Sequence, residues 1–255
     1  MTTFPVSMAT ISAFLLVLSR TGAWVITAPV LSAKGVSSIG RLGLAVALAV
    51  FVTPMTPATQ VPQDVAPFLV ASAGQVAVGL ALGLLTNLLF AAFKVAGTIA
   101  DLAGGFSYAS IVDPLSGQPA AVLSRLFALC FSAVFFASDA YQVVVGGFVR
   151  SFDAIPLDHF PTLSAGAAAA LGHAATQILL SALEVAAPLL GVLFLTDAAL
   201  GVAARFVPQA NAMALALPVK TLVALSAAGA TLALLPAHAA GLLDPSLRLP
   251  FAVLR

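Results

Sequence analysis

The stretch VAPFLVASAGQVAVGLALGLLTNLLFAAF, from Val65 to Phe93, decides the fold class of this chain. It contains no aspartate, glutamate, lysine or arginine. A helix needs roughly 18 or more apolar residues to span the hydrocarbon core of a bilayer, and this stretch is longer than that. Gly79 and Gly83 form a GxxxG pair within it, and such small residues let two helix backbones approach closely in lipid. The stretch therefore predicts a membrane-spanning helix that packs tightly against other helices.

The rest of the chain has the same character. Further uncharged runs extend over Leu42–Gln63, His159–Leu183 and Thr221–Leu243. The chain of 255 residues is 61% hydrophobic and 7% charged, whereas soluble domains are about 45–50% apolar and about 25% charged. In lipid, backbone polar groups must be satisfied within a helix or a closed barrel, and these runs are continuous rather than alternating. We therefore expect an all-α, polytopic membrane protein.

The pattern predicts six apolar helical segments, at Val6–Leu31, Arg41–Phe51, Val65–Leu102, Ala120–Ser151, Ser164–Val202 and Met213–Leu235. A cluster of prolines among polar residues, Pro54, Pro57 and Pro62, predicts a loop outside the hydrocarbon between the second and third segments. The N-terminal run Met1–Ser19 lacks the basic residues that precede the apolar core of a signal peptide. We expect this run to be retained as structure.

A second interruption, GGFSYASIVDPLSGQP from Gly104 to Pro119, opposes helix but remains apolar. Its paired glycines and the Asp113-Pro114 turn signal end a helix. Irregular backbone at membrane depth is tolerated only where it is buried in protein or lines a cavity. Two interpretations follow: a surface connection between two spans, or a constriction formed by Phe106, Tyr108, Ile111 and Val112.

Several ionisable residues interrupt the apolar segments, and each costs roughly 2.5–3.5 kcal/mol inside a bilayer. Four carboxylates need an explanation: Asp101, Asp139, Glu184 and Asp197. One explanation is ion coupling in a transporter by Glu184 and Asp197, which share a segment with Pro188 and Gly191. A second is pairing between helices or chains with a basic residue, for which the candidates are Arg125, Arg205 and Lys220.

A third explanation places some of these carboxylates outside the hydrocarbon. Lys94, Gly97, Asp101 and Gly104 fall on one face of a helix. Such a stripe of polar and small residues would face either a wet lumen or a neighbouring helix.

The sequence gives no support for catalysis. It has no HExxH, GxSxG or Walker-type motif, and its histidines, His159, His173 and His238, have no ligand partners at helical spacing. We therefore expect no enzymatic activity, no cofactor and no metal. Cys130 lies within an apolar run, which favours a buried and inert thiol. The net charge of +1, with no basic block, argues against nucleic acid as a partner.

Four motifs, in order along the chain, resemble the FliR/SctT family of export gates in bacterial flagella and type III secretion systems, and its flagellar branch most. They are APVLSAKGVSSIGRLGLAVAL (Ala28–Leu48), GGFSYASIVDPLSGQPAAVLSRL (Gly104–Leu126), VRSFDAIPL (Val149–Leu157) and ARFVPQANAMALALPVK (Ala204–Lys220). The second has the family's glycine, phenylalanine, Asp-Pro and glycine pattern at the same spacing. The chain departs from the family at Ser37, where proline is frequent, at Ser138-Asp139-Ala140, where Asn-Gly-His is frequent, and at Ala216, where glycine is usual.

The resemblance implies long kinked helices and helical hairpins in two parts. Residues 1–165 would form a FliP-like region that includes a plug at 104–119, and residues 166–255 would form a FliQ-like C-terminal hairpin. It also implies one copy of the chain in a hetero-oligomer with FliP and FliQ, contacting FlhB, in the bacterial inner membrane at the flagellar basal body. Unfolded flagellar subunits would pass through this gate.

The resemblance also implies roles for particular residues. The plug or pore would contain Gly104, Gly105, Phe106, Tyr108, Ile111, Val112, Asp113, Pro114 and Gly117. Subunit contacts would involve Arg205, Pro208, Gln209, Asn211, Pro218 and Lys220. Buried charges would be Asp101, Arg125, Asp139, Glu184 and Asp197. The alternatives are a gate subunit of a virulence-type secretion system and a stand-alone, ion-coupled transporter of small solutes.

Overall fold

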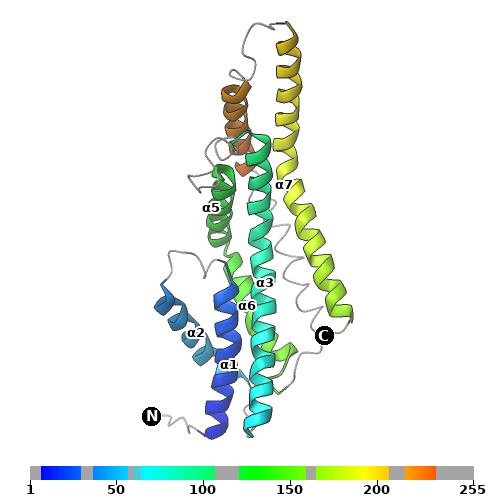
Figure 1. Ribbon diagram of the computed structural model, residues 1–255. Helices are drawn as coiled ribbons and strands as arrows, with labels where there is room; N and C mark the ends of the chain where they lie inside the picture. The colour runs from blue at the N-terminus through cyan, green and yellow to red at the C-terminus, as the bar shows by residue number, and fades with distance from the viewer. Residues whose placement is uncertain are drawn as a thin grey trace, which may run out of the picture. The chain divides into compact units, whose positions relative to one another are not determined.

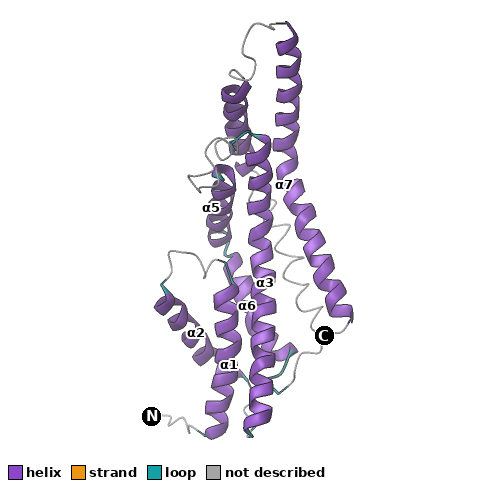
Figure 2. Cartoon of the chain, in the orientation of Figure 1, coloured by secondary structure: helices purple, strands orange, loops and turns teal. Residues whose placement is uncertain are grey.

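The computed structural model describes residues 7–29, 37–56, 61–62, 64–106, 121–158, 165–206 and 216–233. Within these ranges every regular element is a helix (Figure 2), which confirms the all-α prediction. The elements are α1 (Met8–Thr27), α2 (Ser38–Val52), the short 3-10 helix η1 (Thr53–Met55), α3 (Val65–Ala103), α5 (Val122–Ala137), α6 (Ala140–Ala154), α7 (Ala165–Phe206) and a last helix, Ala216–Ala233.

Most of these helices have the length and composition of membrane spans. Among the described residues, 5 helices are long and apolar enough to cross a membrane, and the bent pair α5 and α6 would bring the number to 6 as one span. The prediction of a polytopic membrane protein is thereby confirmed. The run Val65–Phe93, which decided the fold class, lies entirely within α3.

The chain forms two compact units, and it passes between them at Leu88–Leu89 in α3, at Ser138–Asp139 and at Ala174–Ala175 in α7. The first unit contains α1, α2, the first part of α3, and α6. The second contains the rest of α3, α5, most of α7 and the helix Ala216–Ala233.

In the first unit, α1 packs closely along the first part of α3, and the two helices lie side by side in Figure 1. The GxxxG pair makes this contact. A Cβ atom on Gly79 would collide with the backbone carbonyl of Arg20 and lie 2.9 Å from the Cβ of Ala23. A Cβ atom on Gly83 would collide with the Thr27 side chain. These glycines therefore permit tight helix packing, as predicted, and the helix that packs against them is α1.

In the second unit, aromatic side chains join α3 to α5. The rings of Phe93 and Phe131 stack with centroids 3.8 Å apart. Phe90 meets Phe131 and Phe135 edge to face, with centroid distances of 4.8 Å and 5.1 Å. Offset and edge-to-face geometries are the favoured ones for aromatic pairs, so this cluster holds the two helices in a defined register.

The expected continuous helix from Ala120 to Ser151 is wrong, because the helix breaks between α5 and α6. Asp139 has φ 56, in the left-handed region, which cannot continue a right-handed helix. Short polar residues such as aspartate tolerate this conformation better than other non-glycine residues. Hydrophobicity is continuous across the break, and for that reason the apolar pattern did not reveal it.

Candidate functional site

A buried carboxylate joins the last turn of α3 to the start of α5. Asp101 is 2% exposed. Its Oδ1 accepts a hydrogen bond from the backbone amide of Leu123 over 2.8 Å, and its Oδ2 accepts one from the amide of Ser124 over 2.9 Å. We call the residues that meet here the α3–α5 clamp, defined as Gly97, Thr98, Asp101, Leu123 and Ser124.

The physical need for this carboxylate lies at the start of α5. The first amides of a helix have no acceptor within the helix, and the helix N-terminus has a partial positive charge. A side chain just before the helix usually accepts from the second or third amide, but Ala121 precedes α5 and supplies no side-chain cap. Asp101 of α3 supplies both acceptors instead. The start of α5 is therefore capped by another helix.

The two backbones touch at the clamp. A Cβ atom on Gly97 would lie 2.5 Å from the Cα of Ser124 and 2.9 Å from the carbonyl oxygen of Leu123. The Ser124 hydroxyl donates to the carbonyl of Lys94 over 3.0 Å, and it lies 3.1 Å from the Thr98 hydroxyl. The stripe of polar and small residues predicted on this helix thus faces α5 of the same chain at Gly97 and Asp101.

The backbone of Asp101 also fixes the chain where it leaves α3. The amide of Phe106 donates to the carbonyl of Asp101 over 3.1 Å, and the amide of Gly105 donates to the carbonyl of Leu102 over 3.4 Å. Gly105 has φ +81, a conformation that glycine adopts without strain. These bonds and this φ define a Schellman motif, which ends a helix and satisfies its last carbonyls. One residue thus holds both the exit from α3 and the entry to α5.

Only the first residues of the predicted plug, Gly104, Gly105 and Phe106, belong to the described part of the chain. A Cβ atom on Gly104 would lie 2.9 Å from the Cβ of Ala224, and one on Gly105 would lie 3.5 Å from Leu217. The end of α3 therefore contacts the helix Ala216–Ala233. The other predicted plug residues lie outside the described residues: Tyr108, Ile111, Val112, Asp113, Pro114 and Gly117.

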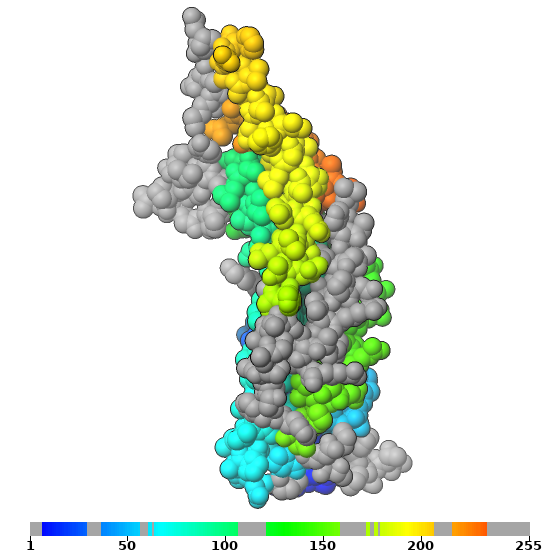
Figure 3. Space-filling model, turned by 90° about the vertical axis from the view of Figure 1, so that its right-hand side faces the viewer, coloured from blue at the N-terminus to red at the C-terminus, as the bar shows by residue number. Residues whose placement is uncertain are grey.

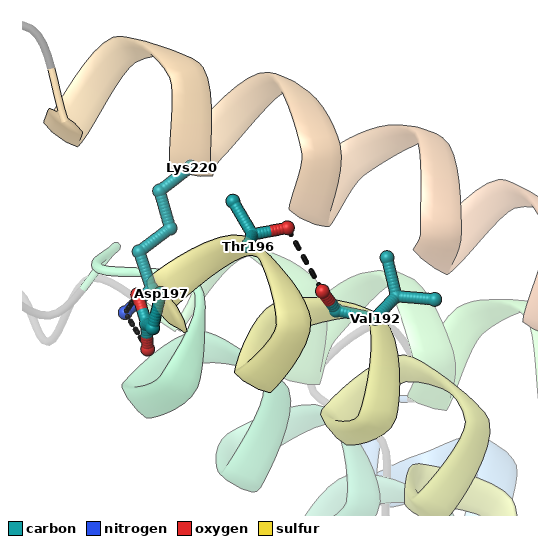
Figure 4. A network of polar contacts seen from close by, with 4 residues as sticks. All are labelled: Val192, Thr196, Asp197 and Lys220. Atoms are coloured by element: carbon teal, nitrogen blue, oxygen red, sulfur yellow. Dashed lines mark hydrogen bonds and ion pairs between the residues drawn. The ribbon is translucent and has the colours of Figure 1, made fainter. Parts of the chain in front are cut away.

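Lys220 forms an ion pair within the chain. Its Nζ lies 2.7 Å and 2.8 Å from the two carboxylate oxygens of Asp197 on α7 (Figure 4). The Lys220 side chain is 20% exposed and the Asp197 side chain 52% exposed. One turn of α7 next to this pair is closed by the Thr196 hydroxyl, which donates to the carbonyl of Val192 over 2.8 Å. A lysine and a carboxylate that the sequence singled out separately are thus partners.

The remaining predicted residues lie on the surface of the single chain or outside the described ranges. Arg125, Asp139, Glu184, Arg205 and Pro218 are exposed. Of the charges predicted to be buried, only Asp101 is buried by the chain itself, whereas Arg125, Asp139, Glu184 and Asp197 are exposed. Their burial against lipid or another subunit stays a prediction. Pro208, Gln209 and Asn211 lie outside the described residues.

Sequence reasoning missed the most buried charged residue of the described ranges. Arg20 of α1 is 0% exposed, and its Nε donates to Oε1 of Gln75 on α3 over 2.6 Å. Its Nη1 donates to the carbonyl of Ser151 over 2.9 Å, and its Nη2 donates to the carbonyl of Ile155 over 2.8 Å. The guanidinium carbon also lies 4.2 Å from the ring centroid of Phe152. We call this the Arg20 centre.

The Arg20 centre satisfies the carbonyls at the end of α6. Gln75 continues it, since its Nε2 donates to the carbonyls of Pro156 and Leu157 over 3.4 Å and 3.2 Å. The Ser151 carbonyl also accepts from the amide of Ile155 over 3.0 Å, whereas the Ile155 carbonyl lies past the last turn of α6. The C-terminal end of a helix carries partial negative charge, so a cation is favoured there. The motif VRSFDAIPL contains these carbonyls, and an arginine inside an apolar run was the available signal for their partner.

Residues that could ligate a metal do not gather in the described part of the chain: it holds no group of three or more His, Cys, Asp or Glu side chains suited to an ion. The two polar sites bind helix ends to side chains of other helices, and both are enclosed by apolar packing. Long apolar helices with their buried polar groups satisfied in this way define a polytopic, membrane-embedded protein.

The comparison with known families specifies this class further. The family model "Bacterial export proteins, family 1" matches residues 11–245, and the chain belongs to that family. It is 32% identical over 218 residues to the flagellar biosynthetic protein FliR of Escherichia coli (strain K12), a match that covers 86% of this chain and 83% of that protein. It is 31% identical over 214 residues to FliR of Bacillus subtilis (strain 168), covering 82% and 81%. The Yop proteins translocation protein T of Yersinia pestis is 28% identical over 215 residues, covering 83% and 82%.

Proposed function

We propose that this chain is a structural and gating subunit of the flagellar type III protein-export gate, through which unfolded flagellar subunits cross the inner membrane. The observation that carries this proposal is the similarity to FliR proteins of two different bacteria over more than four-fifths of the chain. Its several apolar helices fit a membrane-embedded export component. The subunit acts without catalysis: it encloses and seals a passage.

We further propose that the chain consists of two parts, with a plug segment in the first. Residues 1–165 form a FliP-like region and residues 166–255 a FliQ-like hairpin, in a hetero-oligomer with FliP and FliQ that contacts FlhB in the inner membrane at the flagellar basal body. The segment 104–119 is the plug. Glycines allow pliable backbone conformations, and apolar side chains in a narrow pore resist wetting. The α3–α5 clamp supports this assignment, because it fixes the chain just before and just after that segment.

Contacts to other subunits are proposed at Arg205, Pro208, Gln209, Asn211 and Pro218. A partner can approach Arg205 and Pro218, since both are exposed on the chain. Lys220 is engaged by Asp197 within the chain, so any role in assembly would use this ion pair rather than a free lysine.

Two other functions compete with this one. The first is a gate subunit of a virulence-type secretion system, which the 28% identity to the Yersinia protein supports. That identity is lower than the 31% and 32% identities to the FliR proteins, so the flagellar gate is preferred. A stand-alone, ion-coupled transporter would need Glu184 and Asp197 as coupling groups. Asp197 is paired with Lys220, and Glu184 is exposed, so the described residues do not bring the two carboxylates into one site.

The test is genetic complementation followed by purification. In a flagellated bacterium that lacks its own FliR, the chain should restore swimming and the secretion of flagellar subunits into the medium. After mild solubilisation it should co-purify in a large assembly with unequal subunit numbers. Purification as a monomer or a symmetric oligomer would favour the transporter. Failure to restore swimming here, with restored virulence secretion in a second strain that lacks its virulence-type gate subunit, would favour the virulence-type gate.

A further inference from the structure

The α3–α5 clamp combines features of a fixed junction. Asp101 and Ser124 are each 2% exposed, and both oxygens of the Asp101 carboxylate are bound to backbone amides. Hydrogen bonds to a charged acceptor are among the stronger ones in proteins, and a buried group that loses its partner bears the full cost of desolvation. Separation of α3 from α5 would leave one carboxylate and two amides without partners at once.

The packing around the Asp101 carboxylate also indicates a fixed junction. Gly97 brings the α3 backbone against Ser124, and the stacked pair of Phe93 and Phe131 continues the contact along the same two helices. Close-packed contacts of this kind have discrete arrangements and do not deform continuously. A helix pair that moved apart during function would lose all of these contacts together.

From this geometry we propose that Asp101 is a positioning residue which keeps α3 and α5 joined throughout protein export, so that the clamp stays closed while substrate passes. The inference rests on the proposed function, because its readout is export. It assigns Asp101 a role that differs from both ion coupling and pairing with a cation. The carboxylate works as an interhelical cap, and its partners are backbone amides.

A reversible covalent bond across the clamp tests whether it opens. The hydroxyls of Thr98 and Ser124 lie 3.1 Å apart, so cysteines at both positions bring two thiols together. The double variant Thr98→Cys/Ser124→Cys is made with Cys130→Ala, which removes the only native thiol. Each single cysteine variant in the same background is a control. The extent of cross-linking is read after denaturation, from the loss of labelling by a maleimide polymer.

If the clamp stays closed during export, formation of the disulfide should not reduce export. The disulfide would then fit every working state of the gate equally well, so it would not shift the equilibrium between those states. A loss of export on oxidation that a reductant reverses would overturn the proposal. So would failure of the disulfide to form in the assembled protein, since the two side chains would then not be neighbours there.

A second measurement tests Asp101 itself. Asp101→Ala should lose export and gain ion leak, whereas Asp101→Asn, which keeps one acceptor, should lose less. The disulfide between positions 98 and 124 should restore export to Asp101→Ala, since it joins the same two helices covalently, although the amides of Leu123 and Ser124 stay without the carboxylate. Asp153→Ala, the same change at an exposed carboxylate of α6, is the matched control and should export normally.

Each result of this second measurement decides the question. Normal export by Asp101→Ala would overturn the role of Asp101, and so would a cross-linked Asp101→Ala that stays inactive. If Asp101→Ala fails to accumulate, recovery of its level with the disulfide supports the proposal, and no recovery contradicts it. The unaltered chain is assayed in parallel: if it does not restore export at all, the proposed function fails, independently of the clamp.

Discussion

Arg20 and Asp101 have opposite roles at the two buried polar sites found among the described residues. Arg20 brings donors to carbonyls at the end of α6, and Asp101 brings acceptors to amides at the start of α5. Each therefore matches the partial charge of a helix end that belongs to another helix. In lipid, unsatisfied backbone groups have no water to bind, so such side chains can fix helix ends that would otherwise be costly.

Replacement of Arg20 by alanine should lower the free energy of unfolding of the first unit by about 2 kcal/mol or more, since the Ile155 carbonyl and Oε1 of Gln75 would lose the donor that Arg20 supplies, and each buried acceptor left without a donor costs about 1–3 kcal/mol. Trp24, the single tryptophan, stacks on Phe148 in the same unit with centroids 4.5 Å apart, so its fluorescence reports this loss in a denaturant titration. Arg150→Ala removes an exposed arginine from α6 and is the control. Equal stability of the two variants would contradict the assigned role of Arg20.

Asp139 offers a second prediction at the residue scale. Its φ of 56 is a conformation that costs a non-glycine residue roughly 1–2 kcal/mol. Asp139→Gly should therefore be neutral or raise the free energy of unfolding by up to about 1 kcal/mol, and Asp139→Val should lower it. Ser138→Gly, at a residue with φ −92, lacks this benefit and should be destabilising. The midpoints of denaturant unfolding rank the three variants, and a stabilising valine would refute the argument.

At the scale of elements, two kinds of helix contact hold the protein together. α1 and α3 meet through small residues with their backbones close, whereas α3 and α5 meet through stacked phenylalanines and close only at the clamp. The contact of α1 with α3 depends on the absence of side chains at its glycines, and the contact of α3 with α5 depends on large aromatic side chains. Steric changes at the first contact should therefore be more damaging than equal changes elsewhere on a helix.

Gly79→Ala and Gly83→Ala test this difference. Each adds one methyl group where backbone or side-chain atoms of α1 already stand, and overpacking of this kind costs about 1–3 kcal/mol. Gly43→Ala is the matched control, because nothing lies within 4 Å of a Cβ atom at that position of α2. Alanine favours helix by up to about 1 kcal/mol over glycine, so the control should be unchanged or stabilised. Trp24 fluorescence in a denaturant titration measures all three, and equal effects would count against the close contact.

At the scale of the whole molecule, its helices are long and much of their surface is apolar. α3 has 39 residues, or about 58 Å at about 1.5 Å per residue, against a hydrocarbon core of about 30 Å. Part of α7 is visible on the face shown in Figure 3, where its colour runs from yellow-green to gold. Its exposed side chains include Leu179, Leu180, Leu183, Val192, Phe194, Leu195, Val202 and Phe206. Such a surface requires lipid or another protein, which agrees with a membrane-embedded subunit of an assembly.

The plug assignment is tested at this scale, since it concerns the assembled gate. Deletion of Phe106–Gly117 leaves every residue of the α3–α5 clamp in place and should raise the ion conductance of the cell membrane, because the pore would lose its apolar seal. The variant must first be shown to enter the assembly at the wild-type level. Membrane conductance equal to that of wild-type cells, with normal assembly, would remove the plug from the proposal.

Much of this architecture follows from sequence patterns that are local. The uncharged run Val65–Phe93 predicted α3, the GxxxG pair predicted a close helix contact, and Asp101 stood out as a charge in need of a partner. The break at Asp139 could not be predicted from hydrophobicity, because the apolar pattern continues through it. The resemblance offered one clue there, since the family frequently has glycine at that position.

By itself, the sequence determined that this protein is helical, lies in a membrane and belongs among export proteins, because length, apolarity and motif spacing are properties of consecutive residues. Tertiary structure alone decided which distant groups satisfy one another. Arg20 meets carbonyls that follow it by more than a hundred positions, and Asp101 meets amides beyond the segment 107–120. The reason is that these partners are backbone groups. Every residue has the same carbonyl, and every residue except proline has the same amide N–H, so only the folded chain determines which of them a side chain meets.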